Sequence, residues 1–254
     1  MYPKLMKQLT GTYPLSRREL LWYAGATAVS ALIASRVNPA GAAEPTGTVA
    51  GTAPACVVRP QQTAGPYFVD ERLLRSDIRL DPSDGSVQEG VPVRLAFRVL
   101  RLAGEGCTPL SGAAVDIWHC DALGRYSDVL DMSHLFDTRG KKFLRGAQMT
   151  DAIGTAQFIT IYPGWYPGRT VHIHFKIRVH PAARRGFEFT SQLYFDEALT
   201  DRVHAQAPYA TKGPRPLKND QDGLFRRGGR ELLLQLSPDT PGYAGRFDIG
   251  LRVT

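Results

Sequence analysis

The segment VHIHFKIRV, residues 171–179, alternates apolar and polar side chains with a period of two. This period is typical of a β-strand, in which successive side chains point to opposite faces. The apolar face, from Val171 to Val179, predicts contact with a core. The other face carries His172 and His174, which project together and form a natural pair of metal ligands unless that face is solvated. The pattern alone leaves both readings of the histidine face open.

Similar signals along the chain predict an all-β fold. Further strands are expected at residues 91–99, 114–118, 156–162, 187–195, 231–236 and 247–253. Turns rich in Gly, Pro and Asp separate them, and no long segment after the N-terminal region has helical periodicity. Such short strands predict an antiparallel sandwich or barrel, and we expect a β-sandwich. The irregular stretches 127–146 and 198–230 exceed ordinary connections, which predicts functional loops over a binding site or short helical turns.

The first 43 residues have the pattern of an export signal. Arg17 and Arg18 precede an uncharged, Ala-rich stretch from Trp22 to Ser35, and small residues follow at 40–43. The twin arginine predicts export through the bacterial twin-arginine route, to the periplasm or the medium. The apolar stretch is shorter than the roughly 20 residues that span a bilayer, so stable membrane association after leader cleavage is not expected. An uncleaved anchor is the alternative.

The formal net charge of +7 does not indicate nucleic-acid binding. Residues 1–43 hold five basic side chains and one acidic side chain, so +4 of the charge lies in the leader. The remaining positive charge is spread without a basic run over a Gly/Pro/Thr-rich linker, 44–55, and the domain expected at 56–254. Nucleic-acid partners usually require a concentrated basic patch. A nucleic-acid partner is therefore not expected.

Three cysteines remain, and their spacing matches no zinc motif. They are Cys56, Cys107 and Cys120. An odd number of cysteines in an exported protein permits one disulfide and one free thiol. The sequence does not choose the pair, and a structural role is the expectation for all three.

Two tyrosines in turns accompany the histidines. Tyr126 follows a predicted strand in the segment GRYS, residues 124–127, and Tyr166 lies in YPGWYPGR, which ends three residues before His172. A phenol has a free pKa near 10 and becomes a good ligand only after losing its proton. A ferric ion can hold it as a hard anionic oxygen donor. Two phenolates and two imidazoles would leave such an ion close to charge-balanced, with room for a bidentate substrate.

These motifs resemble the signature of the intradiol ring-cleavage dioxygenases, the protocatechuate and catechol dioxygenase family. The segments that carry the resemblance are QTAGPYF (62–68), GAAVDIW (112–118), GRYS (124–127), Tyr166, RTVHIHF (169–175) and SQLYF (191–195). They span the chain from about Cys56 to the C-terminus, and their order makes the match specific. The resemblance implies an exported β-sandwich catalytic domain with one Fe(3+) per chain. It also implies that O₂ opens a small aromatic diol between its two hydroxylated carbons, giving a muconic-type diacid.

The resemblance implies a role for individual residues. The implied iron ligands are Tyr126, Tyr166, His172 and His174. Tyr126 would stay bound, whereas Tyr166 would leave when the substrate chelates the metal. Arg169 would stabilise the carbanionic form of the bound ring, and Gln192 would lie near the substrate and oxygen side of the site.

Several alternatives remain at this point. Only two residues separate Tyr166 from Arg169, whereas the familiar aromatic dioxygenases have a longer insertion there, so Tyr162 is a rival for the displaceable tyrosine. The histidine face could instead serve a secreted β-sandwich binding module. A zinc or copper site that adds His119 is a further alternative. A homo-oligomer is compatible with the sequence, which does not determine the oligomeric state.

Overall fold

The computed structural model describes residues 57–104, 106–179 and 186–253. The predicted export signal and linker lie outside these residues. The strands are β1 (Pro92–Ala103), β2 (Gly106–Pro109), β3 (Ala114–Trp118), β4 (Arg145–Met149), β5 (Thr155–Ile161), β6 (His172–Val179), β7 (Phe187–Tyr194), β8 (Leu236–Asp239) and β9 (Gly242–Leu251). The helical elements are α1 (Glu197–His204) and three short 3-10 helices, η1 (Tyr209–Lys212), η2 (Asn219–Gln221) and η3 (Gly229–Leu232). None of the helices in the described ranges is long and apolar enough to span a membrane.

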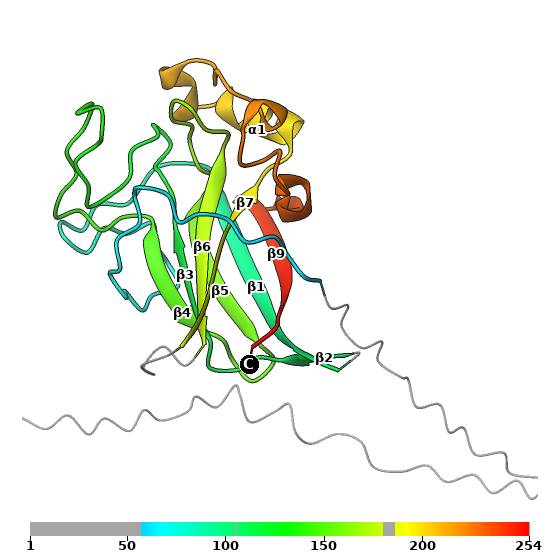
Figure 1. The fold of residues 1–254 in the computed structure, drawn as a ribbon. Helices are drawn as coiled ribbons and strands as arrows, with labels where there is room; N and C mark the ends of the chain where they lie inside the picture. The colour runs from blue at the N-terminus through cyan, green and yellow to red at the C-terminus, as the bar shows by residue number, and fades with distance from the viewer. Residues whose placement is uncertain (1–56, 105, 180–185, 254) are drawn as a thin grey trace, which may run out of the picture. The chain divides into compact units, whose positions relative to one another are not determined.

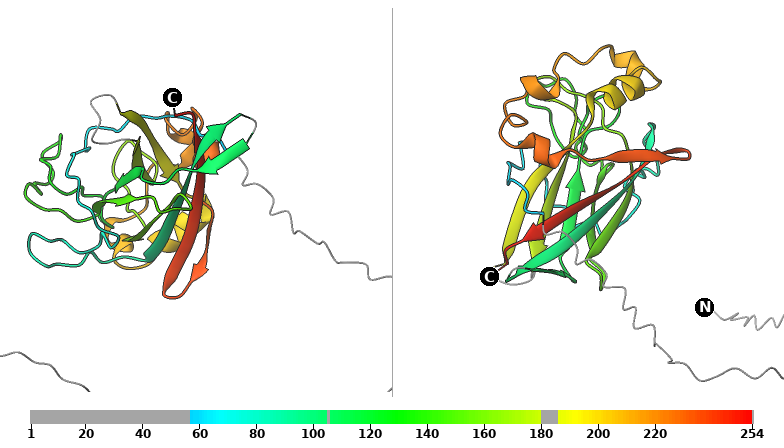
Figure 2. Two further views of the ribbon diagram at one scale, coloured as in Figure 1. Left: turned by 90° about the horizontal axis from the view of Figure 1, so that it is seen from below. Right: turned by 90° about the vertical axis from the view of Figure 1, so that its right-hand side faces the viewer.

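The strands form two sheets, which confirms the predicted all-β sandwich (Figure 1). One sheet has the order β2–β1–β9–β8, with β5 also paired to β1, and the other has the order β4–β3–β6–β7. The expectation of wholly antiparallel pairing was wrong for one pair, because β1 and β9 run parallel. Parallel neighbours need a long connection. Here the chain forms the whole second sheet before it returns beside β1 (Figure 2).

Aromatic side chains join the two sheets in the core. The ring of Phe97 on β1 lies 5.2 Å from that of Phe175 on β6, 6.0 Å from that of Phe247 on β9 and 6.2 Å from that of Phe158 on β5, measured between centroids. The contact with Phe175 crosses between the sheets. The predicted core face of residues 171–179 is confirmed, since its five apolar side chains are at most 3% exposed.

The remaining strand predictions agree with the structure except at 231–236. There the chain forms η3, and β8 begins only at Leu236. Leu232 and Leu234 are buried, but the segment joins the sheet through a single bridge between Leu233 and Tyr194 instead of a ladder. Burial of alternate leucines thus produced a strand-like pattern without a strand. The sequence also gave no signal for β2 or for β4, whose residues RGAQM lack a β-branched or aromatic side chain.

The irregular stretch 198–230 carries short helices, one of the two outcomes expected for it. Helix α1 begins after Asp196, whose side chain accepts the backbone N–H of Leu199 as an N-cap. This helix and the 3-10 helices gather at one end of the sandwich (Figure 2). Among the cysteines, Cys107 is disulfide-bonded and Cys120 is a buried free thiol, while Cys56 lies outside the described residues.

We expect Phe97→Ala to destabilise the protein by about 3–5 kcal/mol, the usual cost of deleting a buried aromatic ring. The loss should be large because Phe97 contacts rings from both sheets. Urea denaturation followed by tryptophan fluorescence would measure the free energy of unfolding. Ile153→Ala is the matched control, since Ile153 is 65% exposed and its truncation should change stability by less than about 0.5 kcal/mol. Equal effects of both substitutions would contradict this account of the core.

Candidate active site

Four potential metal donors converge on the face of β6 that points away from the core. His172 and His174 are each only 2% exposed, and their Nε2 atoms lie 3.0 Å apart. The hydroxyl oxygen of Tyr166 lies 3.4 Å from Nε2 of His172, and that of Tyr126 lies 3.5 Å from the same atom. The structure therefore brings together all four predicted ligands. The histidine face is buried and not solvated.

Both imidazoles are in the neutral form that binds metals. Nδ1 of His172 lies 2.6 Å from the backbone oxygen of Thr170. A carbonyl only accepts hydrogen bonds, so Nδ1 carries the proton and Nε2 presents its lone pair. Burial lowers the pKa of His172 to about 3 and holds the pKa of His174 well below its usual value. The His174 ring is fixed by parallel stacking on Trp118, at 5.0 Å between centroids and an interplanar angle of 2°.

A tight turn after β3 aims Tyr126 at the histidines. The Asp121 carboxylate accepts two backbone N–H groups of this turn, at 2.8 and 2.9 Å. Gly124 adopts φ +81°, and a Cβ there would lie 2.1 Å from the backbone oxygen of Trp165, so only glycine fits. Tyr126 itself is 1% exposed, and its ring stacks on that of Tyr67 at 4.6 Å. These local contacts therefore fix the position of the Tyr126 phenol without a ligand.

The phenols need a cation to become ligands. Burial raises the pKa of Tyr166 to about 12 and raises the pKa of Tyr126 well above its ordinary value. Both therefore stay protonated at neutral pH unless a metal ion lies beside them, because the Arg169 charge alone does not offset burial. A multivalent cation among the four donors would reverse this preference. Hard phenolate oxygens together with imidazoles suit Fe(3+), so the residues present fit that ion.

Tyr162 and His119, the alternative donors that the sequence left open, lie elsewhere. The hydroxyl of Tyr162 donates to Oγ1 of Thr200 at 2.7 Å, and its ring packs on that of Phe195. His119 is fully buried, and both of its ring nitrogens are hydrogen-bonded, to the backbone oxygen of Cys120 at 2.8 Å and to Oγ1 of Thr160 at 2.7 Å. Tyr162 and His119 are core residues in this structure, and neither joins the donor group.

Arg169 is held beside the donors by a carboxylate that the sequence did not reveal. Its Nε lies 2.7 Å from Oδ2 of Asp222, whose side chain is only 1% exposed. The same oxygen accepts the backbone N–H of Thr170 at 2.9 Å. Burial raises the pKa of Asp222, but the Thr170 N–H and the Arg169 charge outweigh it, so the net pKa is lowered. Asp222 lies in the irregular stretch 198–230, where nothing in the sequence distinguishes it from neighbouring carboxylates.

The register of β6 against β7 explains the position of Gln192. His174 pairs with Gln192, and His172 pairs with Tyr194. Oε1 of Gln192 accepts a hydrogen bond from Arg169 at 2.7 Å, while its Nε2 donates to the backbone oxygen of Thr63 at 3.1 Å. Gln192 therefore holds the terminal Nη2 of the Arg169 guanidinium, and Asp222 holds its Nε. Of the three residues predicted to be catalytic, Tyr166 is one of the four donors, and the structure places Arg169 and Gln192 next to them.

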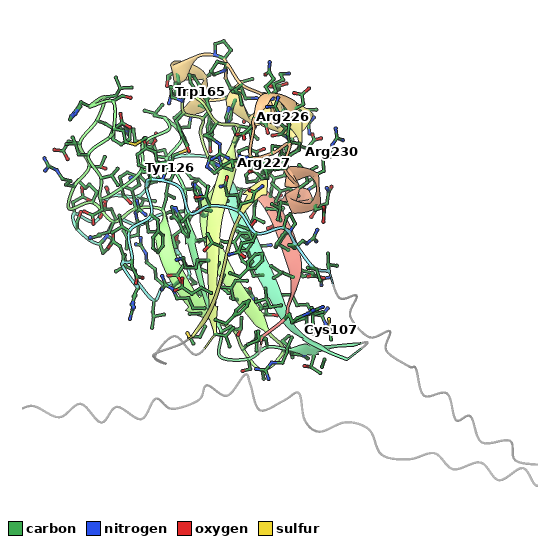
Figure 3. All side chains as sticks on the ribbon, viewed as in Figure 1. Cys107, Tyr126, Trp165, Arg226, Arg227 and Arg230 are labelled. Carbon is green, nitrogen blue, oxygen red and sulfur yellow. The ribbon has the colours of Figure 1, made fainter. Side chains whose placement is uncertain are left out.

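A cleft of about 610 Å³ opens over this site. Its walls include Gly65 to Tyr67, the segment from Asp131 to Phe136, and Tyr166 to Arg169. Tyr126 and Trp165 lie at the end of the sandwich that carries α1, whereas Cys107 lies near the opposite end (Figure 3). The two predicted loop regions thus gather around the site, which agrees with the sequence expectation for them.

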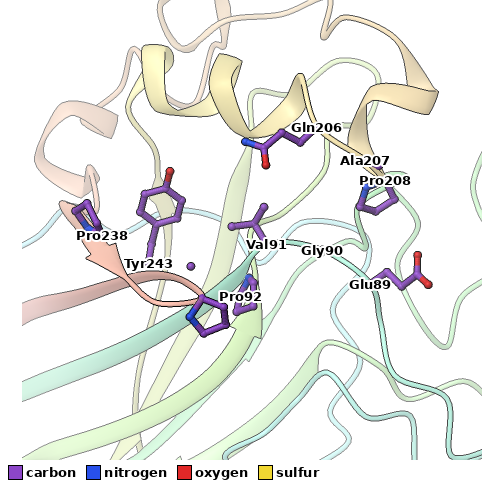
Figure 4. A pocket seen from close by; sticks show the side chains of 11 residues that line it. Glu89, Gly90, Val91, Pro92, Gln206, Ala207, Pro208, Pro238 and Tyr243 are labelled. Atoms are coloured by element: carbon purple, nitrogen blue, oxygen red, sulfur yellow. The ribbon is translucent and has the colours of Figure 1, made fainter.

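A second hollow of about 550 Å³ lies where β1 begins, beside the β8–β9 turn and the segment after α1 (Figure 4). Proline and glycine make up much of its wall. Its titratable lining consists of Glu89 and Tyr243. The Tyr166 phenol and the Arg169 guanidinium line the first cleft, which is therefore the better candidate for chemistry.

Comparisons with known proteins agree with this geometry. The structure is similar to an intradiol ring-cleavage dioxygenase from Tetranychus urticae, with a TM-score of 0.66 and 28% identity over 78% of this chain and 95% of that one. Residues 63–210, more than half of the chain, match the dioxygenase family model. The chain belongs to the intradiol ring-cleavage dioxygenase family. Tyr126, Tyr166, His172 and His174 all lie within this matched region.

Two further proteins are similar to this member of the intradiol dioxygenase family. The dioxygenase domain of a carbohydrate-binding fusion protein from Streptomyces sp. SirexAA-E is 30% identical, with a TM-score of 0.54 over 78% of this chain and all of that one. The protocatechuate 3,4-dioxygenase beta chain of Burkholderia cepacia is 32% identical over 124 residues, or 45% of this chain. The matched region spans about half, 51%, of that curated relative.

We expect Asp222→Asn to destabilise the protein at pH 7 by about 1.5–3 kcal/mol, the range for hydrogen bonds to charged groups. A lowered folded-state pKa means that Asp222 stabilises the fold above the unfolded pKa of about 3.9. This contribution is lost as the pH falls through the lower folded pKa. The stability gap between the two proteins should therefore shrink below about pH 4, as urea denaturation at pH 7, 5 and 3 would measure.

The exposed neighbour Asp220 supplies the control for this prediction. Asp220→Asn should leave stability nearly unchanged at each pH, because its carboxylate is solvated. A gap for Asp222→Asn that stayed constant down to pH 3 would contradict the assigned ionisation of Asp222.

Proposed function

We propose that the protein is a mononuclear non-haem iron(III) dioxygenase. It opens a catechol-type ring between the two hydroxylated carbons with O₂, giving a muconic-type diacid. The observation that carries the proposal is the convergence of two phenol oxygens and the Nε2 atom of His174 on Nε2 of His172, each at 3.5 Å or less from that atom. The names of the relatives from Tetranychus urticae and Burkholderia cepacia support the same reaction.

Tyr126, Tyr166, His172 and His174 would hold the ion. Bound Fe(3+) would supply Lewis-acid chemistry that binds both substrate oxygens and makes the diol reactive toward O₂. The two phenols differ in their surroundings. Tyr166 lines the cleft, whereas Tyr126 is buried beneath the Tyr67 ring. Tyr166 is therefore the ligand that could move when a diol enters, and, held as a phenolate by the ion, its oxygen would then be able to accept a proton from the substrate.

Arg169 supplies fixed positive charge at the cleft. Its guanidinium lines the wall and is held by Asp222 and Gln192, so little reorganisation is needed when negative charge develops on the ring. Gln192 lies opposite His174 in the sheet, which puts its amide on the same side as the reacting atoms. Arg169 and Gln192 thus provide and orient positive charge, whereas Tyr166 would accept a proton.

The leader predicted at residues 1–43 adds a proposal about location. Export through the twin-arginine route would carry the enzyme to the periplasm or the medium, already folded and loaded with its metal. The substrate would then be an aromatic diol met outside the cytoplasm.

Iron reconstitution provides the main test. We expect about one iron per chain and a broad visible band from tyrosinate-to-ferric charge transfer, which shifts when catechol is added without O₂. Tyr126→Phe and His174→Ala should each lose stable iron binding, because each removes one of four donors. Metal analysis and visible absorption would measure both. A protein that stayed colourless after reconstitution would leave the family and fold intact but would sink the proposed reaction.

The two candidate tyrosines form a matched pair in the same experiment. Tyr166→Phe should change the visible band and abolish its shift with catechol, whereas Tyr162→Phe should keep both, because the Tyr162 hydroxyl bonds to Thr200. The opposite result would assign the displaceable phenol to Tyr162.

We expect Arg169→Ala to retain iron but to lose turnover by about 10²–10³-fold, the usual effect of removing one preorganised charge-stabilising group. Oxygen consumption with catechol would measure kcat. Arg226→Ala is the control, since Arg226 is an exposed arginine (Figure 3) whose loss should leave kcat unchanged. Full activity of Arg169→Ala with normal iron content would remove Arg169 from the mechanism.

A further inference from the structure

The cleft is larger than one dihydroxylated ring requires. Its volume of about 610 Å³ lies within the range of roughly 300–1,000 Å³ found for clefts that hold drug-sized ligands. The reacting end is fixed by Tyr166 and Arg169, which line the cleft. The rest of the volume extends toward the segment from Asp131 to Phe136, so a substrate that filled it would carry a substituent on that side.

The segment 131–136 presents apolar side chains at the rim of the cleft. Met132 is 68% exposed and Leu135 is 75% exposed, and both line the cleft together with Phe136. Exposed apolar area of this kind is unfavourable in water, at about 25 cal/mol per Å². Apolar side chains gathered at a binding groove commonly mark the surface that a ligand covers.

The rim is held in place through Asp131. Its Oδ1 accepts a hydrogen bond from the Tyr67 hydroxyl at 2.7 Å. Its Oδ2 accepts the backbone N–H groups of Ser133 at 3.0 Å and Leu135 at 3.3 Å. Tyr67 in turn stacks on Tyr126. The apolar rim is therefore tied to the donor site and does not need to be ordered when a ligand binds, which lowers the entropic cost of binding.

The cations of the cleft wall already donate hydrogen bonds within the protein. Arg125 lies 2.8 Å from the Asp121 carboxylate, Arg169 bonds to Asp222, and Lys212 donates to the backbone oxygens of Leu123 and Trp165. Among the described lining residues these are the cations, and each is engaged within the protein. Asp131 adds negative charge beside the rim. A carboxylate on a substituent at the rim would therefore meet the like charge of Asp131, together with cations that already donate hydrogen bonds within the protein.

We propose that the substrate is a catechol bearing an uncharged, apolar alkyl or aryl substituent, which packs against Met132 and Leu135. This rests on the proposed function for its reacting end. The ring hydroxyls face the four donors, and the substituent covers the rim. Met132 and Leu135 are thus specificity-determining residues, and carboxylated rings such as protocatechuate are disfavoured.

The test compares three probes: catechol, 4-butylcatechol and protocatechuate. Their dissociation constants would be measured by calorimetry without O₂, and kcat/KM by oxygen consumption. We expect 4-butylcatechol to bind at least tenfold more tightly than catechol, because each buried methylene strengthens binding about fourfold. Protocatechuate should bind no better than catechol. The double variant Met132→Ser, Leu135→Ser should lower the preference for butylcatechol at least fivefold.

Leu74→Ser is the matched control, since Leu74 is 70% exposed and does not line the cleft. It should keep the full preference. Tighter binding of protocatechuate, or an undiminished preference in the double variant, would overturn the inference. So would a dimer seen by sedimentation that dissociates only in the double variant, because a second copy would then cover the rim.

The binding measurement separates this inference from the proposed function. Selective binding of butylcatechol without ring opening of any probe would support the rim assignment and refute the dioxygenase reaction. Ring opening of all three probes without selectivity would support the reaction and refute the role of Met132 and Leu135.

Discussion

Strand β6 is buried on both of its faces, and the rest of the domain packs around one face or the other. Its apolar side chains meet Phe97 and the rest of the inter-sheet core. Its polar side chains, His172 and His174, would be costly to bury without partners. Trp118, Tyr126 and the segment that contains Gly65 cover them, and a Cβ on Gly65 would already approach His174 to 3.2 Å. The residues on this second face of β6 and those that cover it form the candidate active site.

The site is assembled from segments far apart in the chain, because turns and strands supply different chemical groups. Phenol oxygens come from turns, where the backbone can aim one side chain, and imidazoles come from a strand, where spacing is fixed. Arg169 is oriented by a carboxylate from beyond α1 and an amide from β7. Each group is held by at least one further contact, so the arrangement is preorganised for a ligand.

The sequence predicted those features that depend on local pattern. The alternation in residues 171–179 predicted the buried strand, and the motifs around Tyr126, Tyr166 and Arg169 predicted which side chains meet. Features that depend on contacts between segments distant in the sequence could not be predicted from it. Asp222 has no motif, the parallel partner of β1 depends on topology, and the leucines near Leu234 mimic a strand because one side is buried. The two hydrogen bonds that retain His119 in the core likewise come from distant or backbone atoms.

The parallel pairing of β1 with β9 also bears on how the domain folds. Strand β9 lies between β1 and β8, so the larger sheet cannot close until residues 242–251 have been synthesised. The partner strands are separated by most of the domain, and contacts between residues so far apart in sequence form slowly because the intervening chain must first be ordered. During translation β1 therefore exposes one unpaired edge. A chaperone that shielded this edge would protect the nascent chain from aggregation until β9 arrived.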